Sequence, residues 1–200
     1  MRVQIEGDSN TTIEWLNGRW DMKNPRLAPA LARARRSLYV AWGTGRVNVA
    51  TDGADWARHI YREYNKDCDA TATAALERQC EIAAINLVPW ELLRGHAEAN
   101  VVARFDGGRR EGKAGAAWAL WVKIGTNMYP WMVYGFGVGS ATSSSAELAA
   151  CSSLCSHIEH MAERLAACGM PDLGIDEAQR VPRRIRPRLA LADTLIACAP

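Results

Sequence analysis

The sequence predicts an α/β fold built from strands and helices around a common core. The first residues alternate between apolar and polar, with Val3 and Ile5 on one side, and lead through a glycine-containing turn into a helical pattern. Three β-rich runs follow later, at 101–105, 117–124 and 131–138, separated by glycine-containing turns. A long stretch then repeats apolar residues at intervals of three and four, which is typical of an amphipathic helix.

Length and composition fit a globular chain with a sizeable core. The chain has 200 residues, of which 48% are hydrophobic and 23% charged, and these values are ordinary for folded domains. The formal net charge of +2 makes it only mildly basic, so composition alone does not indicate a nucleic-acid-binding protein. We find no apolar run as long as a membrane span and no signal-like leader, and we expect a soluble intracellular protein without a membrane partner.

The cysteines do not indicate a disulfide framework or a zinc site. The six cysteines form no Cys-x-x-Cys pair, and Cys151 and Cys155 stand four residues apart in a segment rich in alanine and leucine. This spacing favours small core residues on a helix.

The N-terminal part is predicted to hold a strand, helices and shorter elements. The strand at 3–6 ends at Gly7, and a helix begins near Ile13. A second helix runs from Pro25 to about Arg36, because proline is favoured in the first turn of a helix. Residues 38–40 suggest a short strand, residues 43–55 a loop, residues 58–61 an extended segment, and residues 65–79 an alanine-rich helix.

A connector separates this part from the β-rich part. Residues 79–100 resemble a connector in which only residues 90–93 suggest a short helix, so we place the main internal boundary there. The three β-rich runs predict consecutive antiparallel strands, and the helix that follows them begins near Ser144. Residues 171–200 are rich in arginine and proline, and we expect a poorly ordered tail there.

Two motifs in the second part resemble the ribonuclease H family. Residues 104–118 contain Arg-Phe-Asp-Gly-Gly-Arg-Arg, and they resemble the opening strand, glycine-rich turn and second strand of that family. Further along, residues 141–148 are similar to the start of the family's first helix, where a polar run precedes Ala-Glu. The resemblance selects Asp106 at the end of the first strand and Glu147 in the first turn of the helix.

Two motifs in the first part resemble the second half of the same family. Residues 3–9 are similar to its fourth strand and Gly-Asp-Ser turn, and Asp8 matches a third acid. Residues 58–70 resemble its last strand and the start of its last helix, where an Arg-Glu-x-Asn run precedes an acid. Asp69 matches that fourth acid, and His59 stands where some members carry a catalytically helpful histidine.

The two halves stand in reversed order relative to the family. Residues 101–170 correspond to its first half and residues 1–78 to its second half, with the connector 79–100 between them. The resemblance therefore implies a circularly permuted ribonuclease H-like fold, with a mixed five-stranded sheet flanked by helices. Two explanations stay open: a circular permutant that closes one complete fold, or a piece cut from a tandem array that bridges two incomplete copies. The protein would be a monomer if one chain closes the fold, and a strand-swapped dimer if it needs a second copy. We favour the single closed domain, because the family's fourth and first strands are neighbours and about twenty residues easily span the distance.

The resemblance implies a metal-dependent endonuclease that hydrolyses the RNA strand of RNA–DNA hybrids. Carboxylates held close together repel strongly unless cations neutralise them, and oxygen ligands suit two ions of Mg²⁺ or Mn²⁺. In the family's pattern Asp106 would bridge both ions. Glu147 and Asp8 would complete one metal site, and Asp69 would serve the other. His59 would assist product release.

A further set of residues would contact the nucleic acid. The candidates are Gly107, Gly108, Arg109, Ser143, Ser144 and Ser9. The glycine pair permits close backbone approach to a phosphate or sugar, and the arginine would follow the duplex backbone. The family often places asparagine before the helix glutamate to contact the RNA 2′-hydroxyl. Here Ser143 and Ser144 hold those positions, and serine donates and accepts hydrogen bonds but reaches less far.

Each candidate residue also has a structural explanation. Glu147 fits a capping box, Asp8 fits a cap of the helix that follows it, and Asp69 fits a first helical turn, where negative charge is favourable. For His59, a surface histidine at a strand end is the simpler interpretation. The second functional hypothesis is therefore a catalytically inactive nucleic-acid-binding module or a retroelement-derived fragment.

Overall fold

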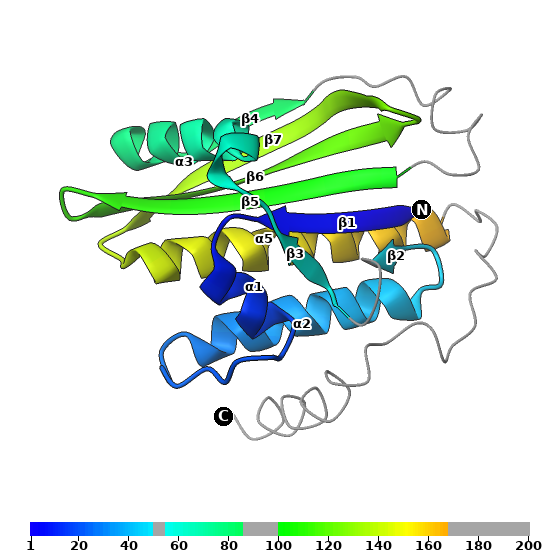
Figure 1. Cartoon of the computed structure of the whole chain (residues 1–200), viewed down its shortest axis with the longest axis horizontal. Coiled ribbons are helices and arrows are strands. Elements are labelled where there is room, and N and C mark those ends of the chain that lie inside the picture. The colour runs from blue at the N-terminus through cyan, green and yellow to red at the C-terminus, as the bar shows by residue number, and fades with distance from the viewer. Residues whose placement is uncertain (50–54, 86–99, 168–200) are drawn as a thin grey trace.

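The computed structural model describes residues 1–49, 55–85 and 100–167. One mixed sheet carries helices against both faces (Figure 1), so the predicted α/β class is confirmed. The strands are β1 (Arg2–Gly7), β2 (Asn48–Val49), β3 (Ala57–His59), β4 (Ile82–Ile85), β5 (Asn100–Arg110), β6 (Lys113–Ile124) and β7 (Asn127–Gly139). The helices are α1 (Asn10–Leu16), α2 (Ala28–Gly43), the short 3₁₀ helix η1 (Arg62–Tyr64), α3 (Lys66–Arg78) and α5 (Ser143–Ala167).

The sheet joins the N-terminal and C-terminal parts of the described chain. Its order is β2-β1-β5-β6-β7-β4. β1 lies parallel to β5, and on its other side it pairs in parallel with both β2 and β3, at opposite ends of the strand. β5, β6 and β7 are consecutive antiparallel strands, as predicted. The described residues form seven strands rather than the expected five, because β2 and β4 are added.

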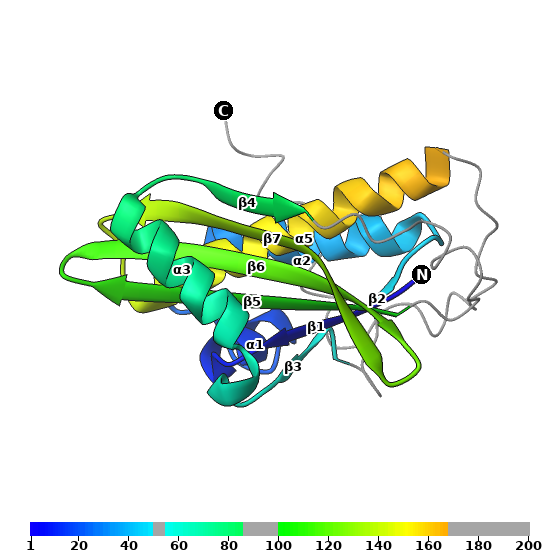
Figure 2. The same ribbon diagram turned by 90° about the horizontal axis from the view of Figure 1, so that it is seen from above.

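The sheet separates two apolar cores of unequal size, and helices cover both of them. α1, α2 and α5 gather on one face of the sheet, and α3 crosses β5, β6 and β7 on the other (Figure 2). The larger core holds Phe105, Leu148 and Ile158. The smaller one, under α3, holds Cys68 and Trp121. Alternation along β5 sends successive side chains into opposite layers.

Helix α2 extends beyond the predicted helix. Residues 38–40, expected to form a strand, lie inside it. Ala34, Leu38 and Ala41 are fully buried at a spacing of four and three residues, on a helix that packs against α5. Burial of this apolar stripe favours helix where the local run Leu-Tyr-Val suggested strand.

The expected connector at 79–100 contains a strand. Residues Ile82–Ile85 form β4 and pair in antiparallel fashion with β7. A short edge strand depends on its partner rather than on a local pattern, so periodicity did not reveal it. The rest of the connector, at 86–99, and the expected tail lie outside the described residues. Within the described ranges, no helix is both long and apolar enough to cross a membrane.

Candidate functional site

Three carboxylates meet at one end of the β1–β5 pair. Asp8 follows the last residue of β1, Asp106 lies in β5, and Glu147 lies near the start of α5. One carboxylate oxygen from each lies within 4.8 Å of the other two. Asp106 is 5% exposed, whereas Asp8 and Glu147 are half-buried. The parallel register, which ends with Gly7 opposite Phe105, brings the first two acids together.

Gly107 allows α5 to approach the strand that carries Asp106. A Cβ at Gly107 would lie 2.2 Å from both the carbonyl carbon of Ala146 and the amide nitrogen of Glu147. Only glycine fits such a contact, which sets Glu147 beside Asp106. The Gly107 amide also donates a hydrogen bond of 2.8 Å to Asp106 Oδ1.

Residues 107–110 continue β5 and do not form the expected glycine-rich turn. Gly108 pairs with Gly115, and the chain reverses at Glu111 and Gly112, whose φ angles are 51° and 79°. The turn lies later in the chain than predicted, because the hydrogen-bonded ladder between β5 and β6 continues to the end of β5. A Cβ at Gly108 would meet nothing within 4 Å. The first glycine of the pair serves helix packing, and the second faces open space.

Burial and mutual repulsion raise the proton affinity of the three-acid cluster. Loss of surrounding water, with the charge of Asp8 nearby, raises the pKa of Asp106 to about 7. Burial of Glu147 and the charge of Asp106 raise the pKa of Glu147 to about 10. Like charges held this close favour a bound proton or a bound cation. At neutral pH the cluster therefore carries less negative charge than three carboxylates in water.

The donor set fits a hard divalent cation. Among the described residues, no N–H or hydroxyl group donates to the buried Oε2 atom of Glu147, and the carboxyl group of Glu147 can hydrogen-bond to Asp106 only while a proton lies between them. An unpaired buried carboxylate oxygen is costly, and carboxylate oxygens are the ligands that Mg²⁺ and Mn²⁺ prefer. A cation held by Asp8, Asp106 and Glu147 would be a partner for this oxygen and would reduce the repulsion among the three carboxylates.

Asp69 and His59 lie in the same region but outside the three-acid cluster. The Asp69 side chain is 40% exposed, and its Oδ1 accepts a hydrogen bond of 2.6 Å from Arg62 Nη2. His59 Nε2 contacts the main-chain oxygen of Asp8 at 3.1 Å. Of the four acids selected from the sequence, three lie together, and the fourth, Asp69, forms an ion pair with Arg62.

A cleft of about 560 Å³ connects all of these residues. Its lining includes all the candidates named above for catalysis, metal binding and nucleic-acid contact, whereas Arg110 and the basic segment at 19–36, which the sequence also suggested for contact with the duplex backbone, are not part of it. These residues are Asp8, Ser9, His59, Asp69, Asp106, Gly107, Gly108, Arg109, Ser143, Ser144 and Glu147, and Thr11, Tyr61 and Arg62 complete the lining. The cleft therefore presents acids, of which Asp106 is the most buried, beside the exposed side chains of Arg62 and Arg109 and several hydroxyl groups.

Besides Thr11 and Tyr61, two residues of this region that form hydrogen bonds with the acids were not selected from the sequence. Asn65 is 1% exposed, and its Nδ2 donates hydrogen bonds to Asp8 Oδ1 at 3.2 Å and to the Phe105 carbonyl oxygen at 2.9 Å. Arg62 holds Asp69. Both belong to the Arg-Glu-x-Asn run, so a signal was present. Their contacts depend on β1 and β5, and no local pattern describes those.

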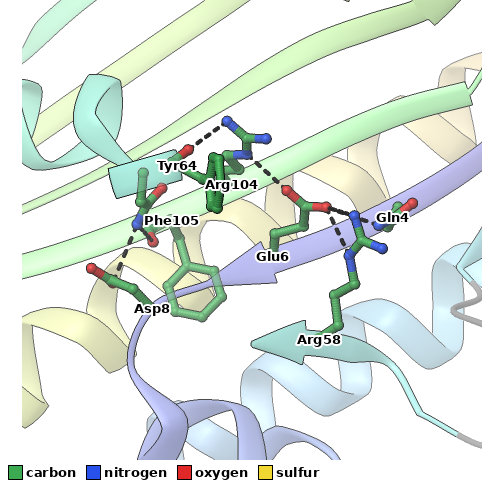
Figure 3. A network of polar contacts seen from close by, with 8 residues as sticks. Gln4, Glu6, Asp8, Arg58, Tyr64, Arg104 and Phe105 are labelled. Carbon is green, nitrogen blue, oxygen red and sulfur yellow. Dashed lines mark hydrogen bonds and ion pairs between the residues drawn. The ribbon is translucent and has the colours of Figure 1, made fainter. Parts of the chain in front are cut away.

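An ion network centred on the buried Glu6 joins the strands that lead into the cleft. Glu6 on β1 is 1% exposed and pairs with Arg58 of β3 and Arg104 of β5 (Figure 3). Arg104 Nε donates to Glu6 Oε2 at 2.8 Å, and its Nη1 donates to the Tyr64 carbonyl oxygen at 2.6 Å. Gln4 adds a hydrogen bond of 2.8 Å to Glu6. The three strands are thus tied together just before the positions that line the cleft.

Comparisons with protein-family models, with curated proteins and with solved structures give no match to this chain. We therefore infer its function from the residues and geometry of the cleft.

Proposed function

We propose that the chain is a metal-dependent endonuclease that hydrolyses the RNA strand of RNA–DNA hybrids. The observation that carries the proposal is the convergence of Asp8, Asp106 and Glu147 to within 4.8 Å. These acids stand in separate segments of the sequence, and a motif resembling the ribonuclease H family selected each of them. Gathered carboxylates suit phosphodiester hydrolysis, in which cations offset the charge of both the ligands and the phosphate.

We further propose that the fold is a circularly permuted form of that family's fold. The parallel pairing of β1 with β5 supports this, because the family's fourth and first strands are neighbours. The antiparallel succession of β5, β6 and β7, followed by α5, agrees with the family's first half. In this arrangement the two halves of the sheet come from one chain.

The acids have separate tasks in this proposal. Asp8, Asp106 and Glu147 would hold one cation, and Asp69 would contribute to a second after release from Arg62. Exposed ion pairs are weak, so a divalent cation can compete with the arginine. Bound Mg²⁺ or Mn²⁺ would supply charge neutralisation, activation of water and stabilisation of the leaving oxygen.

Residues around the acids offer contacts for a nucleic-acid backbone. Arg109 is exposed in the cleft and provides positive charge for a phosphate. Ser143 and Ser144 are exposed at the start of α5, where their hydroxyl groups can contact an RNA 2′-hydroxyl. Contacts of these kinds position a duplex but do not read its sequence, so we expect little sequence preference.

Cleavage of a labelled hybrid tests the proposal. The purified protein is incubated with an RNA–DNA hybrid or a DNA duplex of the same sequence, in Mg²⁺ or in EDTA. We expect RNA-strand cleavage that requires the cation and is lost in Asp106→Asn. Glu111→Gln removes an exposed acid at the β5–β6 turn and should retain full activity. Cleavage that persists in EDTA or in Asp106→Asn contradicts the proposal.

A catalytically inactive nucleic-acid-binding module is the second candidate. Asp69 forms an ion pair with Arg62 outside the three-acid cluster, and this position favours the inactive module. Such a module binds the hybrid with salt-dependent affinity but leaves the RNA intact in Mg²⁺ and in Mn²⁺. Gel-shift and cleavage measurements on the same preparation separate the two candidates.

A further inference from the structure

Asn65 links Asp8 to the strand that carries Asp106, at the point where the sheet ends. The β1–β5 ladder stops with Gly7 opposite Phe105, one residue before Asp8 and Asp106. Beyond this point the Asn65 side chain bridges the two chain segments. Its Nδ2 donates hydrogen bonds to Asp8 Oδ1 at 3.2 Å and to the Phe105 carbonyl oxygen at 2.9 Å. One amide group therefore sets the carboxylate of Asp8 relative to the strand that carries Asp106.

The backbone of Asn65 is itself held in place. Its N–H donates to the Arg62 carbonyl oxygen at 2.9 Å, and its carbonyl oxygen accepts from the Asp69 N–H at 3.0 Å. The preceding residue, Tyr64, accepts a hydrogen bond of 2.6 Å from Arg104. A buried side chain on such a constrained backbone keeps its direction at little further entropic cost.

The orientation of the Asn65 amide follows from its two acceptors. A carboxamide nitrogen carries two hydrogens, which match the Asp8 carboxylate and the Phe105 carbonyl oxygen. Asn65 Oδ1 is buried and has no partner among the described residues. The reversed amide would place this oxygen against two other oxygens, so the observed orientation is favoured even though it leaves Oδ1 unpaired.

We propose that Asn65 is a positioning residue that holds Asp8 in place for cation binding. The inference rests on the proposed function, because it takes Asp8 as a cation ligand. The bond from Asn65 occupies one carboxylate oxygen of Asp8 and leaves the other for the cation. Partners that orient metal ligands typically change metal affinity by about 10- to 100-fold when they are removed.

Binding of Mn²⁺ tests this role without requiring catalysis. Isothermal titration calorimetry on the full chain compares the wild type, Asn65→Ala, Asp8→Asn and the double variant. We expect Asn65→Ala to weaken Mn²⁺ binding about 10- to 100-fold. In the Asp8→Asn background the same change should alter affinity less than about twofold, because Asn65 acts through Asp8.

Asn17 provides a matched control. It is also 1% exposed, and its side chain bonds to the backbone of Trp56 and Ala57 at 2.8 to 3.0 Å. Asn17→Ala should therefore lower stability while leaving Mn²⁺ affinity within about twofold of the wild type. Circular dichroism establishes that each variant is folded, and Asn65→Ser replaces Asn65→Ala if the alanine variant is not.

Each result decides between the alternatives. Unchanged affinity in folded Asn65→Ala, an equal loss in Asn17→Ala, or independent effects of Asn65→Ala and Asp8→Asn would overturn the inference. A wild type that binds no Mn²⁺ overturns it as well. If Mn²⁺ binding and its dependence on Asn65 are observed but no hybrid is cleaved, the positioning role stands and the nuclease proposal fails.

Discussion

Gly107 and Ala146 lie so close together that a Cβ on Gly107 would stand 2.2 Å from the carbonyl carbon of Ala146. A buried strand and the start of a long helix meet here backbone to backbone. Asp106 precedes this glycine and Glu147 follows this alanine. The contact therefore determines how near the two acids approach each other.

Gly107→Ala is expected to lower the free energy of unfolding by about 2 to 4 kcal/mol, because backbone must move to admit the methyl group. Urea denaturation followed by circular dichroism measures the change. Gly108→Ala is the control, since a Cβ there meets nothing within 4 Å, and its effect should stay within about 1 kcal/mol. Equal losses in the two variants would contradict the packing role of Gly107.

Without divalent cations, the free energy of unfolding should decrease as the pH rises from 5 to 8. The pKa of Asp106 is raised from 3.8 to about 7 in the folded protein. Between these values the folded chain binds more protons than the unfolded chain, so the free energy of unfolding decreases as pH rises. We expect Asp106→Asn to be more stable than the wild type at pH 8 by on the order of 1 to 3 kcal/mol.

Thermal unfolding in EDTA at pH 5 and pH 8 checks this expectation. The advantage of Asp106→Asn should shrink at pH 5, where Asp106 is largely protonated in the folded wild type. Addition of Mg²⁺ at pH 8 should raise the midpoint of the wild type but not that of the variant, because a ligand stabilises only the state that binds it. A variant less stable than the wild type at pH 8 would refute the repulsion argument.

Glu6→Gln should destabilise the fold by about 2 to 4 kcal/mol, because it removes the negative charge between two arginines. The Arg58 side chain is 55% exposed and regains water, but Arg104 is only 22% exposed. Glu77→Gln removes an exposed acid from α3 and should change stability by less than about 0.5 kcal/mol. Urea denaturation of both variants gives the comparison. A loss in Glu6→Gln no larger than in the control would mean that the network contributes nothing.

Asp69→Asn should separate stability from activity. Its ion pair with Arg62 is exposed, so the substitution is expected to change the free energy of unfolding by less than about 1 kcal/mol. If Asp69 serves a second cation, the rate of hybrid cleavage at saturating Mg²⁺ should fall about tenfold or more, equivalent to about 1.4 kcal/mol in the barrier. An unchanged rate would place Asp69 outside the reaction.

Local patterns predicted the long strands and the long helix. β5, β6 and β7 appear where runs rich in β-forming residues indicated strands, and α5 appears where helical spacing indicated a helix. The short strands β2 and β4 were not predicted, and residues 38–40 were assigned to the wrong element. In each case the outcome depends on a partner distant in the sequence.

The amino-acid sequence by itself predicted the α/β class and most of the residues that line the cleft, but not Thr11, Tyr61 or Arg62. Only the tertiary structure decided that Asp8, Asp106 and Glu147 meet while Asp69 lies on Arg62. The tertiary structure also shows that Gly107, expected in a turn, packs against the start of α5. It shows as well that Asn65 bridges Asp8 and the main chain of β5. The physical reason is that motifs record residue types along the chain, whereas distances between carboxylates follow from sheet register and backbone packing between remote segments.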